Sequence, residues 1–189
     1  MKPENFPGKV RYMTQDIFYP APKGLPVPIR PQREDESVRQ KILKTDWSKV
    51  CHLKEDSLVR AGALWLHGFL DESHQIVQKD SSAEGSYWHA LMHRSEGDFG
   101  NSMYWFRKVG RHPVYEVLRQ EVEKLEASTE SAQEAQRSLL EDVQWDPQRL
   151  VDLCQKAYDG HFKDLDLLQR VAAAEYNLLM GFVLRQKAD

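Results

Sequence analysis

Apolar residues recur every three or four positions over most of the chain after residue 35, which is the spacing of one face of an α-helix. No stretch alternates β-branched and polar residues over the length of a strand, so the pattern predicts an all-α fold. The expected helices cover residues 36–44, 55–68, 71–79, 84–96, 99–109, 113–126, 131–142, 146–159 and 164–186.

The first 35 residues have a different pattern. They contain seven of the nine prolines, which fix φ and remove backbone donors, so no helix is expected there. They also carry large apolar side chains, among them Phe6, Tyr12 and Phe18, which are too many for a freely solvated tail. We therefore predict an extended proline-rich arm at 1–35 and a single all-helical domain at 36–189, with the arm lying along the helices or against a partner subunit.

The starts of two later helices and the apolar face of the last one can also be predicted. Pro113 and Pro147 lie where helices are expected to begin, since proline suits the first helical turn. The last expected helix, 164–186, is apolar on a wide face. We expect this helix to be central in the fold or to pair with a second copy, so a homodimer through it or through the arm is a further expectation.

Two stretches of the chain are similar to each other at an offset of 29 residues. Residues 68–73, GFLDES, align with 97–102, GDFGNS, and Ala61 then aligns with Ala90. In each stretch a helix is expected to end at glycine, a polar turn to follow and a second helix to return, and Gly160 begins a turn of the same kind. The pattern resembles tetratricopeptide-type helical hairpins. It implies hairpins packed as a compact bundle or a short solenoid.

Composition and charge exclude several classes of protein. The 189 residues are 41% hydrophobic and 29% charged, which is typical of one ordinary globular domain. The 26 basic residues are outnumbered by 29 acidic ones and are spread along the chain, so no nucleic-acid partner is expected. No apolar stretch has the length of a membrane span or a signal sequence, which predicts a cytoplasmic protein without a membrane partner. Cys51 and Cys154 form no metal-binding or disulfide motif.

Candidate chemistry concentrates in residues 87–113, YWHALMHRSEGDFGNSMYWFRKVGRHP, which hold three of the seven histidines. His89, His93 and Glu96 fall on one face of an expected helix, at i, i+4 and i+7. Two imidazoles one turn apart, with a carboxylate a further turn along, can hold a divalent metal such as Zn, Fe or Mn. If the first two hairpins stack, His74 can supply another ligand.

The same segment also favours binding of a small anion. A guanidinium group can clamp a carboxylate or phosphate through two hydrogen bonds, and two arginines lie close to the histidines in the sequence. A hairpin would gather them into one polar cleft. The side chains expected to line this cleft are Tyr87, His89, His93, Arg94, Asn101, Arg107 and His112.

Residues 87–113 also resemble a segment of uncharacterised bacterial and fungal proteins that carry a YWHxxxHR, YWFR and VGxHP series. The resemblance implies that the segment is one unit, but it implies no activity. Our first hypothesis is a helical-hairpin protein that binds a small anionic ligand or a protein partner through the His/Arg cleft. The alternative is a metal-dependent or acid/base enzyme that uses the His89, His93 and Glu96 face, and a third possibility is a hairpin whose histidines only satisfy one another.

Overall fold

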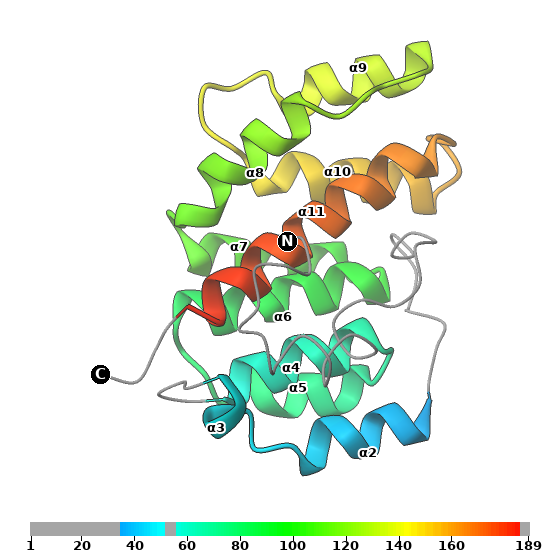
Figure 1. Ribbon diagram of the computed structural model, residues 1–189. Helices are drawn as coiled ribbons and strands as arrows, with labels where there is room; N and C mark the ends of the chain where they lie inside the picture. Colours follow the sequence, from blue (N-terminus) through cyan, green and yellow to red (C-terminus); the bar gives the residue numbers. More distant parts are fainter. Residues whose placement is uncertain (1–34, 52–55, 186–189) are drawn as a thin grey trace.

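The computed structural model describes residues 35–51 and 56–185, and all regular structure in these residues is helical (Figure 1). The all-α prediction is confirmed, and each of the nine expected ranges overlaps a helix to within a few residues at its ends; the short α3 was not expected. Apart from Asp35, the predicted arm lies outside the described residues. The helices are α2 Glu36–Lys44, α3 Trp47–Cys51, α4 Ser57–Leu66, α5 Leu70–Val77, α6 Ala83–Glu96, α7 Phe99–Val109, α8 Pro113–Glu123, α9 Glu130–Leu139, α10 Pro147–Tyr158 and α11 Leu165–Val183.

Local capping explains where several helices begin. The side chains of Asp35, Ser82 and Asp98 accept hydrogen bonds from backbone N–H groups in the first turns of α2, α6 and α7. Pro113 and Pro147 occupy the first turns of α8 and α10, as predicted. These residues fix the starts of the helices that surround the histidine-rich segment.

Two helix pairs, α4–α5 and α6–α7, turn in the same way at the two glycines that the offset of 29 aligned. Gly68 has a φ of 86° and Gly97 a φ of 79°, both in the left-handed region that favours glycine. The backbone N–H groups at these turns bond back to carbonyls of the preceding helix, which is the usual end of a helix at glycine. The second helix of each pair can therefore return alongside the first.

Serine hydroxyls hold the two hairpins closed at equivalent places. The Oγ of Ser73 donates to the carbonyl of Ala61, and the Oγ of Ser102 donates to the carbonyl of Ala90, each at 2.9 Å. Both serines are buried, so each bond satisfies a hydroxyl that would otherwise be unpaired in the core. The internal similarity of the sequence thus corresponds to two hairpins of the same construction.

The third turn, at Gly160, has a left-handed φ of 77° as well, but the helices that it joins pack differently. The main neighbours of α10 are α7 and α9, whereas those of α11 are α8 and α4. In Figure 1, α11 runs obliquely across the stacked helices. The stack is therefore regular only over the first two hairpins.

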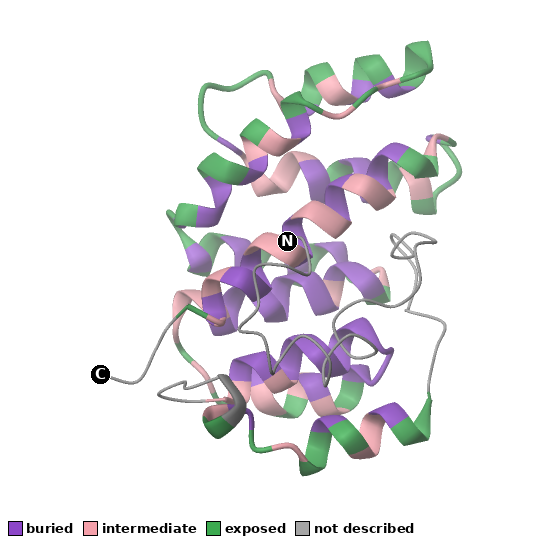
Figure 2. Ribbon diagram, viewed as in Figure 1, coloured by how far each residue is buried: buried purple, intermediate pink, exposed green. Residues whose placement is uncertain are grey.

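The core is centred on α4, α6 and α11, whose residues are mostly buried (Figure 2). On α6 the buried residues lie on several faces, so side chains that point in opposite directions from this helix all enter protein interior. The expectation that the last helix is central is confirmed. In the described part of the chain, no helix combines the length and the apolar character needed to cross a membrane.

Candidate metal centre

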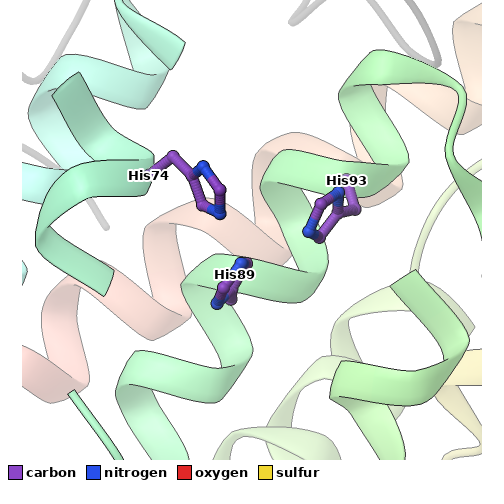
Figure 3. Close-up of side chains that lie close together, drawn as sticks. All are labelled: His74, His89 and His93. Carbon is purple, nitrogen blue, oxygen red and sulfur yellow. The ribbon is translucent and has the colours of Figure 1, made fainter. Parts of the chain in front are cut away.

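Three histidines from two neighbouring helices surround one space (Figure 3). His74 lies on α5, and His89 and His93 lie on α6. One ligand nitrogen from each ring lies within 4.8 Å of the other two. The centroid of the His74 ring is 4.7 Å from that of His89 and 5.7 Å from that of His93. The structure therefore brings His74 to the pair, as stacking of the first two hairpins predicted.

The geometry of α6 places two of the three rings. The helix is capped at its start by Ser82, whose Oγ accepts from the N–H of Gly85 at 3.0 Å. His89 and His93 are four residues apart, so they lie one turn from each other and their rings stack with centroids 5.0 Å apart and planes at 14°. Because α5 packs against α6, it can present His74 to this pair.

The environment keeps two of the imidazoles neutral. His89 is only 3% exposed, and its Nδ1 has no hydrogen-bond partner. Burial, together with the neighbouring His93, lowers the pKa of His89 to about 3. Burial also lowers the pKa of His93, although Asp98 and Glu96 oppose the shift. Near pH 7 both rings therefore offer an unprotonated nitrogen, which is the form that binds a metal.

Trp105 of α7 covers one side of the cluster. Its ring stacks on His89 with centroids 3.8 Å apart and planes at 18°. The ammonium of Lys108 lies 4.6 Å from the centroid of Trp105 and 5.0 Å from that of Tyr104. The indole holds the imidazole in place, and the positive charge of Lys108 adds to the lowering of the pKa of His89.

Glu96, which the sequence placed with the two histidines as a metal ligand, lies on the outer side of His93. Its carboxylate is 3.6 Å from Nδ1 of His93, and the carboxylate of Asp98 is 3.7 Å from the same atom. The group of three ligand atoms contains His74 in place of Glu96. Glu96 therefore lies beside Nδ1 of His93, a histidine that could itself be a ligand, and is not one of the three grouped ligands.

Tyr87 and Arg94, two of the residues expected to line the cleft, are bonded to the last helix instead. The guanidinium of Arg94 donates to a carboxylate oxygen of Glu175 at 2.5 Å, and the hydroxyl of Tyr87 donates to the other oxygen at 3.0 Å. All three side chains are buried. They join α6 to α11, so the structure does not bring them together with the histidines.

The remaining predicted residues are also separated from the three rings. His112 caps α8, where its Nδ1 accepts from the N–H of Val114 at 3.2 Å, and its ring centroid is 5.3 Å from that of Tyr87. Asn101 is exposed, and its Nδ2 donates to Asp98 at 2.7 Å. Arg107 is exposed on α7. Only Asn101 is connected to the histidine cluster, through Asp98.

A polar hollow of about 330 Å³ lies elsewhere, beside α2 and the start of α5. Arg39 in this hollow is paired with Glu72 at 2.6 Å and with Glu36 at 3.1 Å. Its cationic group is therefore already matched by two carboxylates, and none of the predicted site residues lines the hollow.

Two important residues were missed at the sequence level. Glu175 interrupts the apolar face of the last helix four residues after Val171 and four before Leu179, and a lone acid in such a position is a signal of a buried partner. Trp105 was not among the expected site residues, and no pattern in the sequence indicates that it stacks on His89. Both contacts join residues of different helices.

No family model, curated protein or solved structure matches the chain. Imidazoles from two helices, partly enclosed by an indole ring, form a set of nitrogen donors that can hold a metal ion.

Proposed function

We propose that the protein binds a divalent transition metal through His74, His89 and His93. The observation that carries the proposal is the approach of three ligand nitrogens from two helices to within 4.8 Å of one another. In addition, Nδ1 of His89 is buried with no hydrogen-bond partner, so at least one nitrogen of the cluster lacks the contact that buried polar atoms usually have. A buried polar atom without a partner costs about 1–3 kcal/mol, and a metal ion bound at that atom would remove this cost.

The donor set favours zinc or iron over manganese among the metals expected from the sequence. Imidazole nitrogen suits Zn and Fe, whereas Mn prefers carboxylate and water oxygens. Nitrogens bound to one zinc ion at ~2.0–2.1 Å lie roughly 3.4 Å apart in tetrahedral geometry, so the ligand nitrogens, now within 4.8 Å of one another, would need to close by up to about 1.4 Å. Because Trp105 holds the ring of His89, this closure would come mainly from rotation of the His74 and His93 side chains.

Three protein ligands leave a fourth position of a tetrahedral metal open, as in catalytic zinc sites. Water or a small anion would occupy it, so the proposal retains the small-anion hypothesis in another form: the metal, and not an arginine clamp, would bind the anion. Support for this form comes from the arginines themselves. Arg94 is bound to Glu175, and Arg107 is exposed on a different helix from the histidines.

Metal binding can be measured directly on protein purified without a histidine tag and stripped with a chelator. We expect Zn²⁺ or Co²⁺ to bind with one equivalent per chain in calorimetry, and Co²⁺ to give the strong visible absorption of a tetrahedral nitrogen-rich site. The double variant His89→Ala, His93→Ala should lose this binding, and His74→Ala should weaken it.

His161→Ala is the matched control, because His161 is exposed and lies outside the cluster. This variant should bind metal as the unaltered protein does. Circular dichroism of every variant must show the same helical content. Wild-type protein that takes up no more metal than the double variant would refute the proposal.

A further inference from the structure

The contacts of His93 suggest how its ring is directed toward the metal position. Two carboxylates, those of Glu96 and Asp98, lie 3.6 Å and 3.7 Å from Nδ1. Both groups can only accept hydrogen bonds when ionised. A bare lone pair on Nδ1 would face two negative charges, whereas an N–H there would face two acceptors. Both carboxylates lie just beyond hydrogen-bond distance and Nδ1 has no other hydrogen-bond partner, so the charges around this atom favour the second arrangement.

We infer that Glu96 and Asp98 are positioning residues that keep the proton of neutral His93 on Nδ1 and so leave Nε2 free as the metal-binding atom. This inference rests on the proposed metal site. Figure 3 shows one ring nitrogen of His93 turned toward His74 and His89. Since Nδ1 lies beside the two carboxylates, this nitrogen is Nε2.

Asp98 is itself held firmly, which makes it a suitable anchor. Its Oδ1 accepts from the backbone N–H of Asn101 at 3.2 Å, and its Oδ2 accepts from the side-chain amide of Asn101 at 2.7 Å. The same oxygen, Oδ2, is the one nearest to His93. The capping residue of α7 thus connects the start of that helix to the ring of a proposed ligand on α6.

Carboxylates in this outer position have two effects on a metal site. They orient the imidazole, and they raise the basicity of the coordinating nitrogen by accepting from the other one. Loss of such a partner reduces metal affinity by about 10- to 100-fold. They also place negative charge near a cation that would otherwise be bound only by three neutral rings.

The test uses the full chain with Glu96→Gln and Asp98→Asn combined. Asparagine caps helices as well as aspartate does, so α7 should still begin at the same residue. We expect Zn²⁺ affinity to fall by about 10- to 100-fold, measured by competition with a chelator. In metal-free protein labelled with ¹⁵N, two-bond imidazole spectra should show His93 protonated on Nδ1 in the unaltered chain and redistributed toward Nε2 in the variant.

The matched control is Glu123→Gln combined with Asp166→Asn, which removes the same two charges from exposed positions on α8 and α11. Its zinc affinity and its His93 spectrum should not change. An affinity of the first variant within twofold of the unaltered chain would overturn the inference while leaving the metal site standing. A proton found on Nε2 of His93 in the unaltered, metal-free chain would also overturn it, whether or not the protein binds metal. Failure of the unaltered chain to bind zinc would refute the proposed function itself.

Discussion

The face of the helix on which a residue lies determines which other side chains it contacts. His89 and His93 are one turn apart on α6 and meet His74, whereas Arg94 follows His93 directly and meets Glu175 on another side. A step of one residue rotates the side chain by about 100° on an α-helix. Residues that are adjacent in the sequence can therefore belong to separate clusters, and crowding along the chain is a poor guide to a shared site.

Gly62 of α4 shows how tightly this central region is packed. A Cβ added there would lie 2.5 Å from Cζ2 of Trp88 and 2.7 Å from Cε of Met180. Methionine can move, but the buried indole has little space to do so. We expect Gly62→Ala to lower the free energy of unfolding by about 1–3 kcal/mol, measured by urea denaturation.

Gly100→Ala in α7 is the matched control for this substitution. Apart from the adjacent residues and the backbone of its own helix, no atom lies within 4 Å of a Cβ added at Gly100, and alanine restricts the unfolded chain more than glycine does. This variant should be more stable than the unaltered protein by about 0.5 kcal/mol. Equal stabilisation by both substitutions would contradict the packing around Gly62.

Among the elements, α11 depends on one buried ion pair for its register against α6. Glu175 is fully buried and bonded to both Arg94 and Tyr87, whose positions in the sequence are more than 80 residues away. Removing one member of such a pair leaves an uncompensated charge in the core. Much of the rest of α11 is buried through apolar side chains, and at the surface Arg170 donates to the carbonyl of Glu126 at 2.6 Å.

We expect Glu175→Ala to lower the free energy of unfolding by about 3–5 kcal/mol, because Arg94 then remains buried without its partner. Replacing both residues, with Arg94→Met and Glu175→Leu, should restore most of the loss. Urea denaturation measures both effects. The exposed pair of Asp166 with Arg170 on the same helix provides the control, and Asp166→Ala should cost less than about 1 kcal/mol. A loss below that limit in Glu175→Ala would show that the pair is not essential.

Features that depend on residues close together in the sequence were predicted, whereas contacts between distant helices were not. The helix starts at Pro113 and Pro147 and the hairpin turns at Gly68 and Gly97 depend on a few neighbouring residues, so local patterns were sufficient. The shared face of His89 and His93 was equally local. The partners of Arg94 and His89 were not, because Glu175 and Trp105 reach them only through the packing of other helices.

Across the whole molecule, several buried histidines link folding to pH. Burial lowers the pKa values of His89, His93 and His112, and that of His89 falls to about 3 from the usual 6.5. Between these two values the unfolded chain binds more protons than the folded one, so the free energy of unfolding falls as the pH falls. Hydrogen bonds from Ser48 and Lys49 lower the pKa of Asp46 as well, so this carboxyl changes the stability in the same direction, but only at more acidic pH.

We expect urea denaturation to give a free energy of unfolding at pH 5.0 that is lower than at pH 7.5 by about 2 kcal/mol from His89 alone. His89→Gln should reduce this dependence, whereas His161→Ala, at an exposed site, should leave it unchanged. Stability that is constant or increases on acidification would contradict the burial of neutral imidazoles.

Added zinc should raise the free energy of unfolding of the unaltered protein at pH 7.5 if the proposed site binds it.

The two similar hairpins have a consequence for how such a cluster can be recognised. At the offset of 29 residues, His74 corresponds to Met103, His89 to Arg60 and His93 to Leu64. The first hairpin supplies one imidazole and the second supplies two, so the cluster is encoded by the differences between the copies and exists only at their junction. A search profile built on what the hairpins share would pass over all three positions. A pattern that spans the junction, His-x14-His-x3-His within paired helices, would find them.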